Sequence, residues 1–342
     1  MPSREDSGVG EMTVQVPAND AFDVRRAAAA EWPTRDEHAS VIVRDIAARR
    51  RPNGHVIVFA NEKGGVGKST LAFQCALALA HRGHRVVTID CDRRQQTLQR
   101  FLEARDGAIR TLRVNLPRPK HIALETPSGA MLLQELERAE RHYDFVVIDL
   151  AGHDSPIARR AIALADTVVT PVNCSSADLD SLGSMHPISK RLRRAGPFAE
   201  TVMQLREERV RRDLGAFDWV VVKNRVRHCE RRLNAAADRN LATLARHLGF
   251  RLVAGLTERL TYRELLPFGL SHLDLKFLPR LLRPQSAPLK EFLRFMDALD
   301  LPEPGEGAAV AKSLPAAPVL ARTVERYREA LRAATAVPML AE

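Results

Sequence analysis

The chain contains few aromatic residues and few cysteines, and each shortage excludes a class of protein. Aromatic residues make up 5% of the 342 positions although hydrophobic residues make up 45%, so the core must be built mainly from aliphatic side chains. This composition is typical of a helix-rich α/β protein. The four cysteines, Cys75, Cys91, Cys174 and Cys229, are far apart and show no C-x-x-C spacing, which argues against a zinc or redox site and predicts reduced thiols in a cytosolic protein.

Long apolar runs are also missing. No window of about 18 uninterrupted apolar residues is available to span a bilayer, and the stretch MPSREDSGVG lacks the apolar segment of a signal peptide. We therefore expect a soluble, cytoplasmic protein. The tail segment VLARTVERYREALRAAT could form a helix with Leu320, Val324, Tyr327 and Leu331 on one face. Its polar face mixes Glu with Arg, which favours packing or a partner contact over a membrane anchor.

Acidic residues are fewer than basic residues. The chain has 52 Lys and Arg residues against 42 Asp and Glu residues, a net charge of +10, which favours attraction to a polyanion. Residues 190–233 hold 13 basic and 6 acidic side chains, so most of the excess lies in one region.

Five short, continuous apolar runs recur along the chain, separated by segments with helical periodicity. Their continuity indicates strands buried on both faces, which is typical of parallel sheets with helical crossover connections. We expect an α/β fold with a doubly wound, mainly parallel sheet flanked by helices, and ligands at the carboxyl ends of the strands. The runs are HVIVFAN (55–61), RVVTID (85–90), DFVVIDL (144–150), DTVVTPV (166–172) and DWVVVKN (218–224).

The composition changes at both ends of this pattern. Residues 1–53 are mixed in charge with only short apolar runs, and we expect a poorly ordered extension there. Residues 54–302 hold all five apolar runs and are predicted to form the main folded domain. Residues 303–342 contain a Pro/Gly/Ala-rich linker followed by the possible terminal helix.

The segment NEKGGVGKST, residues 61–70, follows the first strand and precedes a helical segment. The backbone N–H groups of such a turn can wrap a pyrophosphate, because glycine has no Cβ to block close approach and a helix N-terminus carries partial positive charge. Lys68 would reach the β and γ phosphates, and the Ser69 hydroxyl would ligate Mg²⁺. The predicted nucleotide contacts are Gly64, Gly65, Val66, Gly67, Lys68, Ser69 and Thr70.

This loop departs from the usual G-x-x-x-x-G-K-[ST] spacing, because Glu62 occupies the position of the first glycine and Lys63 follows it. The pattern K-G-G-x-G-K-[ST] resembles the deviant Walker A motif of the ParA/MinD P-loop ATPases. The resemblance implies that the protein forms a homodimer when ATP is bound and that Lys63 reaches across the interface to the partner's ATP. Slow, dimer-dependent hydrolysis of ATP to ADP and phosphate would then restore the monomer. No arginine finger or substrate pocket is evident that would indicate a fast metabolic enzyme.

Three aspartates at strand ends support this interpretation. Asp90 and Asp92 alternate at the end of one run, so both side chains are expected on one side of the strand. The resemblance makes Asp92 the residue that orients the attacking water, puts Asp90 near the metal, and makes Asp149 the Walker B residue that holds Mg²⁺ through water. ParA-like proteins usually continue D-x-P-G at this point, whereas this chain continues D-L-A-G. Asn224 lies where the family has an adenine contact, although an asparagine at a strand end can also be a plain turn residue.

Longer stretches narrow the resemblance to the MipZ family of division-plane positioning ATPases, over approximately residues 54–300. It implies that monomers contact a ParB-like centromere-binding protein near the cell pole, that ATP dimers bind nucleoid DNA without sequence preference in a polar gradient, and that dimers inhibit FtsZ assembly. The stretches are NEKGGVGKST, IDCDRRQQT, TPVNCSSADLDSLG, FDWVVVKNR and YRELLPFGLSHLDL.

The basic region fits the DNA-binding step independently of the resemblance. Phosphate contacts from Lys and Arg supply affinity without sequence information and weaken with salt. A solvated basic face that serves solubility remains the alternative for any single arginine. The candidate DNA contacts are Arg227, Arg231, Arg232, Arg259 and Arg263.

Other interpretations stay open. A ParA-type chromosome or plasmid partitioning ATPase shares the nucleotide chemistry and DNA binding, and only residues 262–275 distinguish it. A MinD-like membrane switch needs a strongly basic amphipathic anchor, and a nitrogenase-reductase-like iron–sulfur protein needs two cysteines per subunit at the dimer axis. A tyrosine kinase of the superfamily needs a terminal tyrosine cluster, whereas only Tyr143, Tyr262 and Tyr327 are present. A DNA-coating protein without enzymatic activity would bind DNA regardless of ATP.

Overall fold

The computed structural model describes residues 37–49, 53–124, 128–139, 142–186, 191–278 and 286–303, together with residues 326, 329 and 330. The expected amphipathic tail helix and most of the expected N-terminal extension lie outside these ranges.

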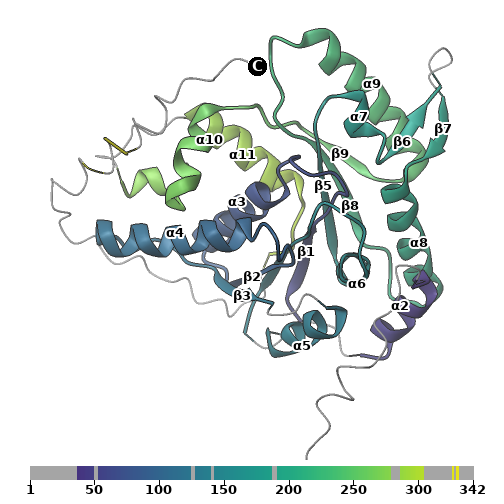
Figure 1. Ribbon diagram of the computed structural model, residues 1–342, viewed down its shortest axis with the longest axis horizontal. Helices are drawn as coiled ribbons and strands as arrows, with labels where there is room; N and C mark the ends of the chain where they lie inside the picture. The colour runs from purple at the N-terminus through teal and green to yellow at the C-terminus, as the bar shows by residue number, and fades with distance from the viewer. Residues whose placement is uncertain are drawn as a thin grey trace, which may run out of the picture.

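A seven-stranded parallel sheet forms the centre of the molecule, in the order β3-β2-β4-β1-β5-β8-β9 (Figure 1). A separate antiparallel pair, β6 and β7, lies at the edge of the molecule near α9. The predicted doubly wound, mainly parallel α/β fold is therefore confirmed. The strands are β1 His55–Phe59, β2 Val86–Asp90, β3 Lys120–Ala123, β4 Phe145–Asp149, β5 Thr167–Val172, β6 Gly183–Met185, β7 Leu192–Ala195, β8 Asp218–Lys223 and β9 Arg251–Val253.

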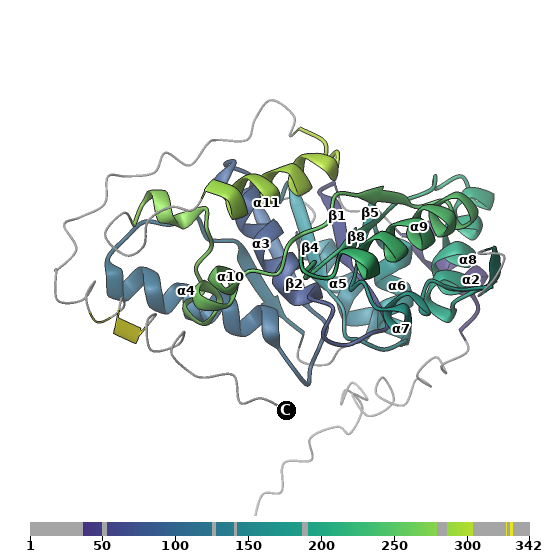
Figure 2. The ribbon, with the colours of Figure 1, turned by 90° about the horizontal axis from the view of Figure 1, so that it is seen from above.

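Helices cover both faces of the sheet. The helices α3, α4 and α11 pack on one face, and α2, α5, α6, α8 and α9 pack on the other (Figure 1). Seen from above, α4 and α10 lie at one end of the molecule and α8 and α9 at the other (Figure 2). The helices are α2 Ala39–Ala47, α3 Lys68–His81, α4 Thr97–Leu112, α5 Gly129–Ala139, α6 Pro156–Leu164, α7 Ser176–Leu179, α8 Pro197–Arg211, α9 Arg231–Leu248, α10 Leu260–Leu265 and α11 Ser286–Ala298, with short 3₁₀ turns at Leu266–Phe268 and Asp274–Lys276.

The central position of β1 in the sheet explains why residues 56–59 are all apolar. Val56 and Val58 belong to the core on the α6 side of the sheet, whereas Ile57 and Phe59 belong to the core on the α3 side. Successive side chains of a strand point to opposite faces, so a strand covered by helices on both sides needs apolar residues at every position. The carboxyl ends of β1, β2 and β4 consequently meet at one edge, where the polar residues of the site begin.

The helix α2 differs from the expectation of a poorly ordered extension up to residue 53. Its residues Ile42, Val43 and Ile46 are 0–2% exposed and pack in the core with α6 and α8. Arg160 of α6 donates to the Glu37 carboxylate at 2.5 Å and lies 3.2 Å from Asp45. A nine-residue helix is marginal alone, and tertiary packing stabilises it here.

The stretch YRELLPFGLSHLDL packs against α4. Gly269 has φ 62, and a Cβ at this position would overlap the backbone nitrogen of Arg105, so only glycine fits the approach. The Arg105 guanidinium, 1% exposed, donates to both oxygens of Asp274 at 2.8 and 2.9 Å. His81 of α3 lies 2.8 Å from the same carboxylate. This buried ion pair fixes the segment that carries α10 beside α3.

Candidate functional site

The loop between β1 and α3 has the backbone of a phosphate-binding turn. Gly65 and Gly67 adopt φ 75 and φ 95, which L side chains rarely adopt. A Cβ on Gly67 would overlap Asn224 Nδ2, so a side chain is excluded there. The helix α3 begins at Lys68, which sets Ser69 and Thr70 in its first turn, where free N–H groups and the helix dipole favour an anion.

The two lysines of the loop occupy different environments. Lys68 is 7% exposed, and its ammonium group donates to the Lys63 carbonyl at 2.9 Å. Burial lowers the pKa of Lys68, while Asp149 and Asp92 act to raise it. The Lys63 ammonium group forms an ion pair with Asp178, in the short helix α7 that follows β5. Lys68 therefore lies over its own loop, and Lys63 is directed away from it.

Asp90 and Asp149 are register partners at the ends of the adjacent strands β2 and β4. Asp149 is completely buried, and neither of its carboxylate oxygens has a hydrogen-bond partner of good geometry among the described residues. Burial and then the charge of Asp90 raise the pKa of Asp149 to about 8, against the smaller effects of the nearby Ser69 hydroxyl and Lys68. A buried carboxylate that lacks a hydrogen-bond partner and lies near a hydroxyl is suited to bind a hydrated cation.

Asp92 lies beyond the end of β2, which stops at Asp90, so strand alternation does not set its direction. Instead, Asp90 accepts the backbone N–H of Asp92 at 2.9 Å, and one Asp92 oxygen accepts the N–H groups of Arg94 and Gln95 at 3.1 and 2.9 Å. These turn contacts hold the Asp92 carboxylate in a half-buried position, with its second oxygen available to another donor.

The loop after β4 retains the glycine of the family pattern for a steric reason. A Cβ on Gly152 would lie 3.0 Å from the backbone nitrogen of Gly64 and 3.3 Å from the carbonyl carbon of Lys63. The two loops are therefore in backbone contact. Contact with the phosphate-binding loop constrains this segment even though Ala151 replaces the expected proline.

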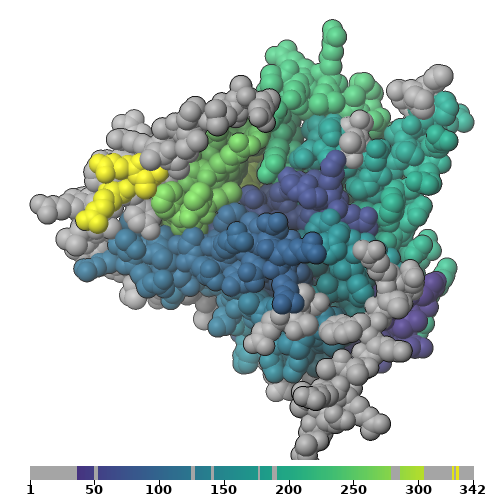
Figure 3. All heavy atoms as spheres, in the orientation of Figure 1, coloured from purple at the N-terminus to yellow at the C-terminus, as the bar shows by residue number. Residues whose placement is uncertain are grey.

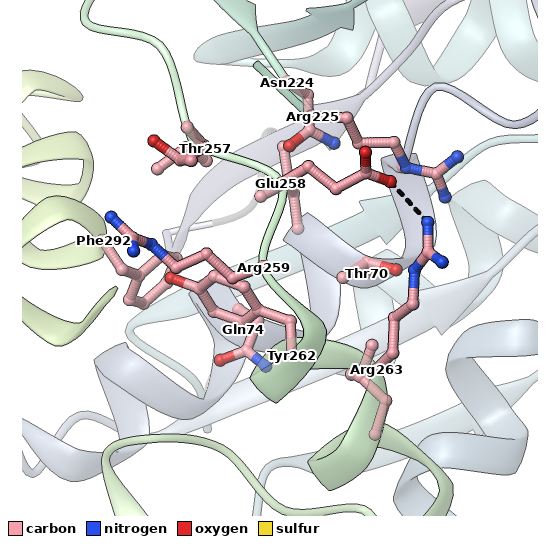
Figure 4. Close-up of a pocket in the computed structure, with 14 residues that line it drawn as sticks. Thr70, Gln74, Asn224, Arg225, Thr257, Glu258, Arg259, Tyr262, Arg263 and Phe292 are labelled. Atoms are coloured by element: carbon pink, nitrogen blue, oxygen red, sulfur yellow. Dashed lines mark hydrogen bonds and ion pairs between the residues drawn. The ribbon is translucent and has the colours of Figure 1, made fainter. Parts of the chain in front are cut away.

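A pocket beside the phosphate-binding loop lies between α3, the end of β8, α10 and α11 (Figure 4). Asn224 closes it next to the loop, and its Nδ2 donates to the Val66 carbonyl at 2.8 Å, so the Oδ1 atom remains as the acceptor. At the other side, Glu291 of α11 accepts the Thr257 N–H at 2.6 Å and pairs with Arg259 at 3.1 Å. The pocket thus combines an amide acceptor with apolar walls that include Leu71, Leu256, Leu266 and Phe292.

The five candidate DNA arginines are not equivalent. Arg259 and Arg263 line the pocket and pair with Glu291 and Glu258 respectively, and Arg227 also pairs with Glu258, at 2.6 Å. Arg231 and Arg232 are exposed in the first turn of α9 and form no ion pair with the residues that the structure describes. The helix lies at the surface, green at the top of Figure 3. Among the residues that the structure describes, Arg231 and Arg232 thus lack an acidic partner, whereas the other three candidates are already paired.

Three residues of the site were missed by the sequence analysis. Asn61 donates to the Pro171 carbonyl at 2.9 Å and accepts the Lys63 N–H at 3.0 Å, so it ties the loop to β5. Asp178 is the partner of Lys63, and Glu291 holds the far side of the pocket. Only Asp178 had a local signal, since S-S-A-D is a capping-box pattern, and Ser175 is indeed the N-cap of α7.

The structure also bears on the iron–sulfur alternative. Cys75, Cys91 and Cys174 are buried and only Cys229 is exposed, so a single subunit does not offer two surface thiols to a shared iron–sulfur cluster. Within the described ranges, no helix is long and apolar enough to cross a bilayer.

Comparison with known proteins agrees with this geometry. Protein ParA from Rhizobium radiobacter is 31% identical over 124 residues, which cover 36% of this chain and 50% of ParA. The chromosome partitioning protein ParA of Caulobacter vibrioides is 28% identical over 171 residues, which cover 40% of this chain and 63% of that protein. The matches thus span between 50% and 63% of these relatives.

Solved structures show the same fold. An ATP complex of Cyanothece McdA superposes with a TM-score of 0.52 at 17% identity, over 74% of this chain and 98% of that one. The family model described as ATPase MipZ matches residues 55–303, which is most of the chain. The chain therefore belongs to the MipZ family within the ParA/MinD ATPases.

Proposed function

We propose that this chain is an ATP-dependent dimerisation switch that binds DNA nonspecifically and positions the division plane by inhibiting FtsZ assembly. Hydrolysis returns it to the monomer. The observation that carries the proposal is the division of labour between the two loop lysines: Lys68 lies over its own phosphate-binding turn, whereas the Lys63 ammonium group is directed out of it to Asp178. A lysine outside its own phosphate site can serve the phosphates of a second subunit.

The pocket supports adenine as the base. Because the Asn224 amide nitrogen is engaged by Val66, its Oδ1 acceptor is the atom that a base would meet. An acceptor suits the exocyclic amino group of adenine, whereas guanine has a carbonyl oxygen at the corresponding position. ATP rather than GTP is therefore the proposed nucleotide.

The donor set supports Mg²⁺ as the cation. Mg²⁺ keeps several water ligands and binds through one or two carboxylates together with substrate phosphates. The unpartnered Asp149 carboxylate, Asp90 beside it and the Ser69 hydroxyl fit this preference. Because these side chains supply only part of an octahedral shell, the phosphates of the nucleotide and water would supply the other ligands. When bound, Mg²⁺ neutralises phosphate charge that develops during hydrolysis.

Asp92 is the proposed residue for orienting the attacking water. The backbone N–H groups of Arg94 and Gln95 fix one carboxylate oxygen of Asp92. The other oxygen can then accept a hydrogen bond from a water molecule. Positioning without a strong base or an arginine finger fits slow turnover, as a timer requires.

Arg231 and Arg232 are the leading candidates for DNA contact. Two cations in the first turn of an 18-residue helix lie at the positive end of its dipole, and that turn contains no acidic side chain. The two guanidinium groups are repelled by each other and by the positive end of the dipole, and an anion such as a DNA phosphate would offset this repulsion. Arg227, Arg259 and Arg263 would first have to leave their carboxylate partners.

A sedimentation assay with FtsZ polymers tests the client. FtsZ is assembled with added wild-type protein in ATP or in ADP, with Asp92→Ala as a slowly resetting variant and Lys68→Ala as a control that cannot bind nucleotide. We expect the ATP form and Asp92→Ala to deplete the pellet, and the ADP form and Lys68→Ala to leave it unchanged. If the pellet is unchanged in both ATP and ADP, FtsZ inhibition is refuted. If it is depleted equally in both, the dependence of the inhibition on ATP is refuted.

A ParA-type partitioning ATPase is the second candidate, because the curated relatives are ParA proteins. It is favoured if the polymers are unaffected while DNA binding still depends on ATP. A ParB-like centromere-binding protein is a proposed partner in both cases, and nucleoid association with a polar gradient is the proposed distribution in the cytoplasm.

A further inference from the structure

The ion pair between Lys63 and Asp178 lies within one subunit, so it competes with any task of Lys63 in a second subunit. We propose that Asp178 is a positioning residue that holds Lys63 in the monomer and thereby sets the threshold for dimerisation. This rests on the proposed function, because it assigns the control of the same lysine.

The backbone of Lys63 is fixed on both sides, so only its side chain can move. Its N–H donates to Asn61 Oδ1 at 3.0 Å, and its carbonyl accepts the Lys68 ammonium group at 2.9 Å. The Lys63 side chain is 36% exposed, whereas that of Asp178 is 8% exposed. The lysine is therefore the mobile partner of the pair and the aspartate is the fixed one.

Asp178 is held in place from several directions. The Ser175 hydroxyl donates to its carboxylate at 2.6 Å, and Ser175 also caps the helix α7 through the Asp178 N–H at 3.2 Å. The helix itself packs against α9. Burial acts to raise the pKa of Asp178, but hydrogen bonds from Lys63 and Ser175 and the charge of Lys63 lower it, so the side chain is ionised.

Transfer of Lys63 to a partner's phosphate leaves this carboxylate buried with only neutral donors. An ionised group that loses its counter-ion in a poorly solvated place opposes the change. The opposition applies twice in a symmetric dimer, once for each subunit. Because Lys63 is partly solvated, each ion pair should weaken the dimer dissociation constant about fivefold, as expected for a partly exposed pair. The two pairs of a symmetric dimer should together weaken it roughly 25-fold.

The test compares two aspartates of the same segment. Asp178→Asn removes the charge but keeps the size and an oxygen for Ser175. Asp180→Asn makes the same charge change at an exposed residue two positions away. Dimer dissociation constants are measured by sedimentation velocity with a slowly hydrolysed ATP analogue. We expect Asp178→Asn to tighten the dimer by about 25-fold and at least fivefold, and Asp180→Asn to change it less than twofold.

An unchanged or weaker Asp178→Asn dimer overturns the proposal, since a weaker dimer would mean that Asp178 orients Lys63 toward the partner. A double-mutant cycle of Lys63→Met and Asp178→Asn, read by urea unfolding of the nucleotide-free protein, checks the resting pair directly. A coupling near zero also overturns the proposal. If the wild type forms no dimer with the ATP analogue, the proposed function fails, whereas a normal wild-type dimer with an unaltered Asp178→Asn dimer removes only the role of Asp178.

Discussion

Replacement of Asp274 by asparagine should destabilise the protein far more than a typical surface substitution. The Asp274 carboxylate is completely buried and accepts hydrogen bonds from Arg105, His81 and Ser271. The neutral amide would leave the Arg105 guanidinium buried without its counter-ion, which costs about 3–5 kcal/mol in comparable pairs. For a domain of this size, that corresponds to a fall in Tm of roughly 6–20 °C.

The pH dependence of stability provides a second signature. Burial acts to raise the pKa of Asp274, but the charge and hydrogen bonds of Arg105 and His81 outweigh it and lower the pKa well below its usual value. A carboxylate with a lowered folded-state pKa contributes stability that is complete above its unfolded pKa, near 3.8, and is lost as the pH falls below it. We therefore expect the wild type to lose more stability than Asp274→Asn over that acidic range.

Urea unfolding followed by circular dichroism measures both effects. Asp106→Asn is the matched control, because Asp106 follows Arg105 in α4. Asp106 pairs with Arg118 at 3.5 Å, and both side chains are about half exposed. The control should lose less than about 1 kcal/mol. A loss below about 1 kcal/mol for Asp274→Asn, or identical acid profiles for variant and wild type, would refute the assigned role of the buried pair.

Four further predictions concern the site and its surroundings. Lys68→Ala should abolish ATP binding in calorimetry, because Lys68 supplies the charge over the phosphate-binding turn, and retained affinity would contradict that role. Lys63→Ala should bind ATP yet remain monomeric in sedimentation, so an ATP-dependent dimer of this variant would exclude the cross-subunit role. The double variant Arg231→Ala, Arg232→Ala should reduce the salt slope of DNA binding by about two phosphate contacts, and an unaltered slope would move the DNA site elsewhere. Burial and then the charge of Arg259 lower the pKa of His272 to about 4. The wild type should therefore lose stability as the pH falls from about 6.5 to about 4, by at most about 3 kcal/mol. His272→Phe should lack this loss, and an equal pH dependence in both proteins would rule out His272 as its source.

The turn after the first strand and the class of the fold were predictable because both leave local signals in the sequence. Continuous apolar runs at β1, β2, β4, β5 and β8 indicated strands buried on both faces, and the structure has them in one parallel sheet. The glycines of the loop indicated a turn open to close approach, and the structure adds that Gly65 and Gly67 adopt positive φ. Such signals depend on residue type and spacing within a few positions of the chain.

Contacts between distant segments were decided only by the tertiary structure. The sequence contains the α2 apolar stripe but not its place in the core, and it contains Arg259 but not its pairing with Glu291 32 positions later. Asp92 illustrates the same limit at close range, because the end of β2 at Asp90 replaces strand alternation with turn hydrogen bonds.

The most consequential of these contacts joins Lys63 to Asp178, which are far apart along the chain. The sequence by itself determined that a second lysine stands in the phosphate-binding loop. Only the fold, by bringing the segment after β5 beside that loop, determined which carboxylate the lysine meets, because the direction of a long flexible side chain depends on the neighbours that tertiary packing supplies.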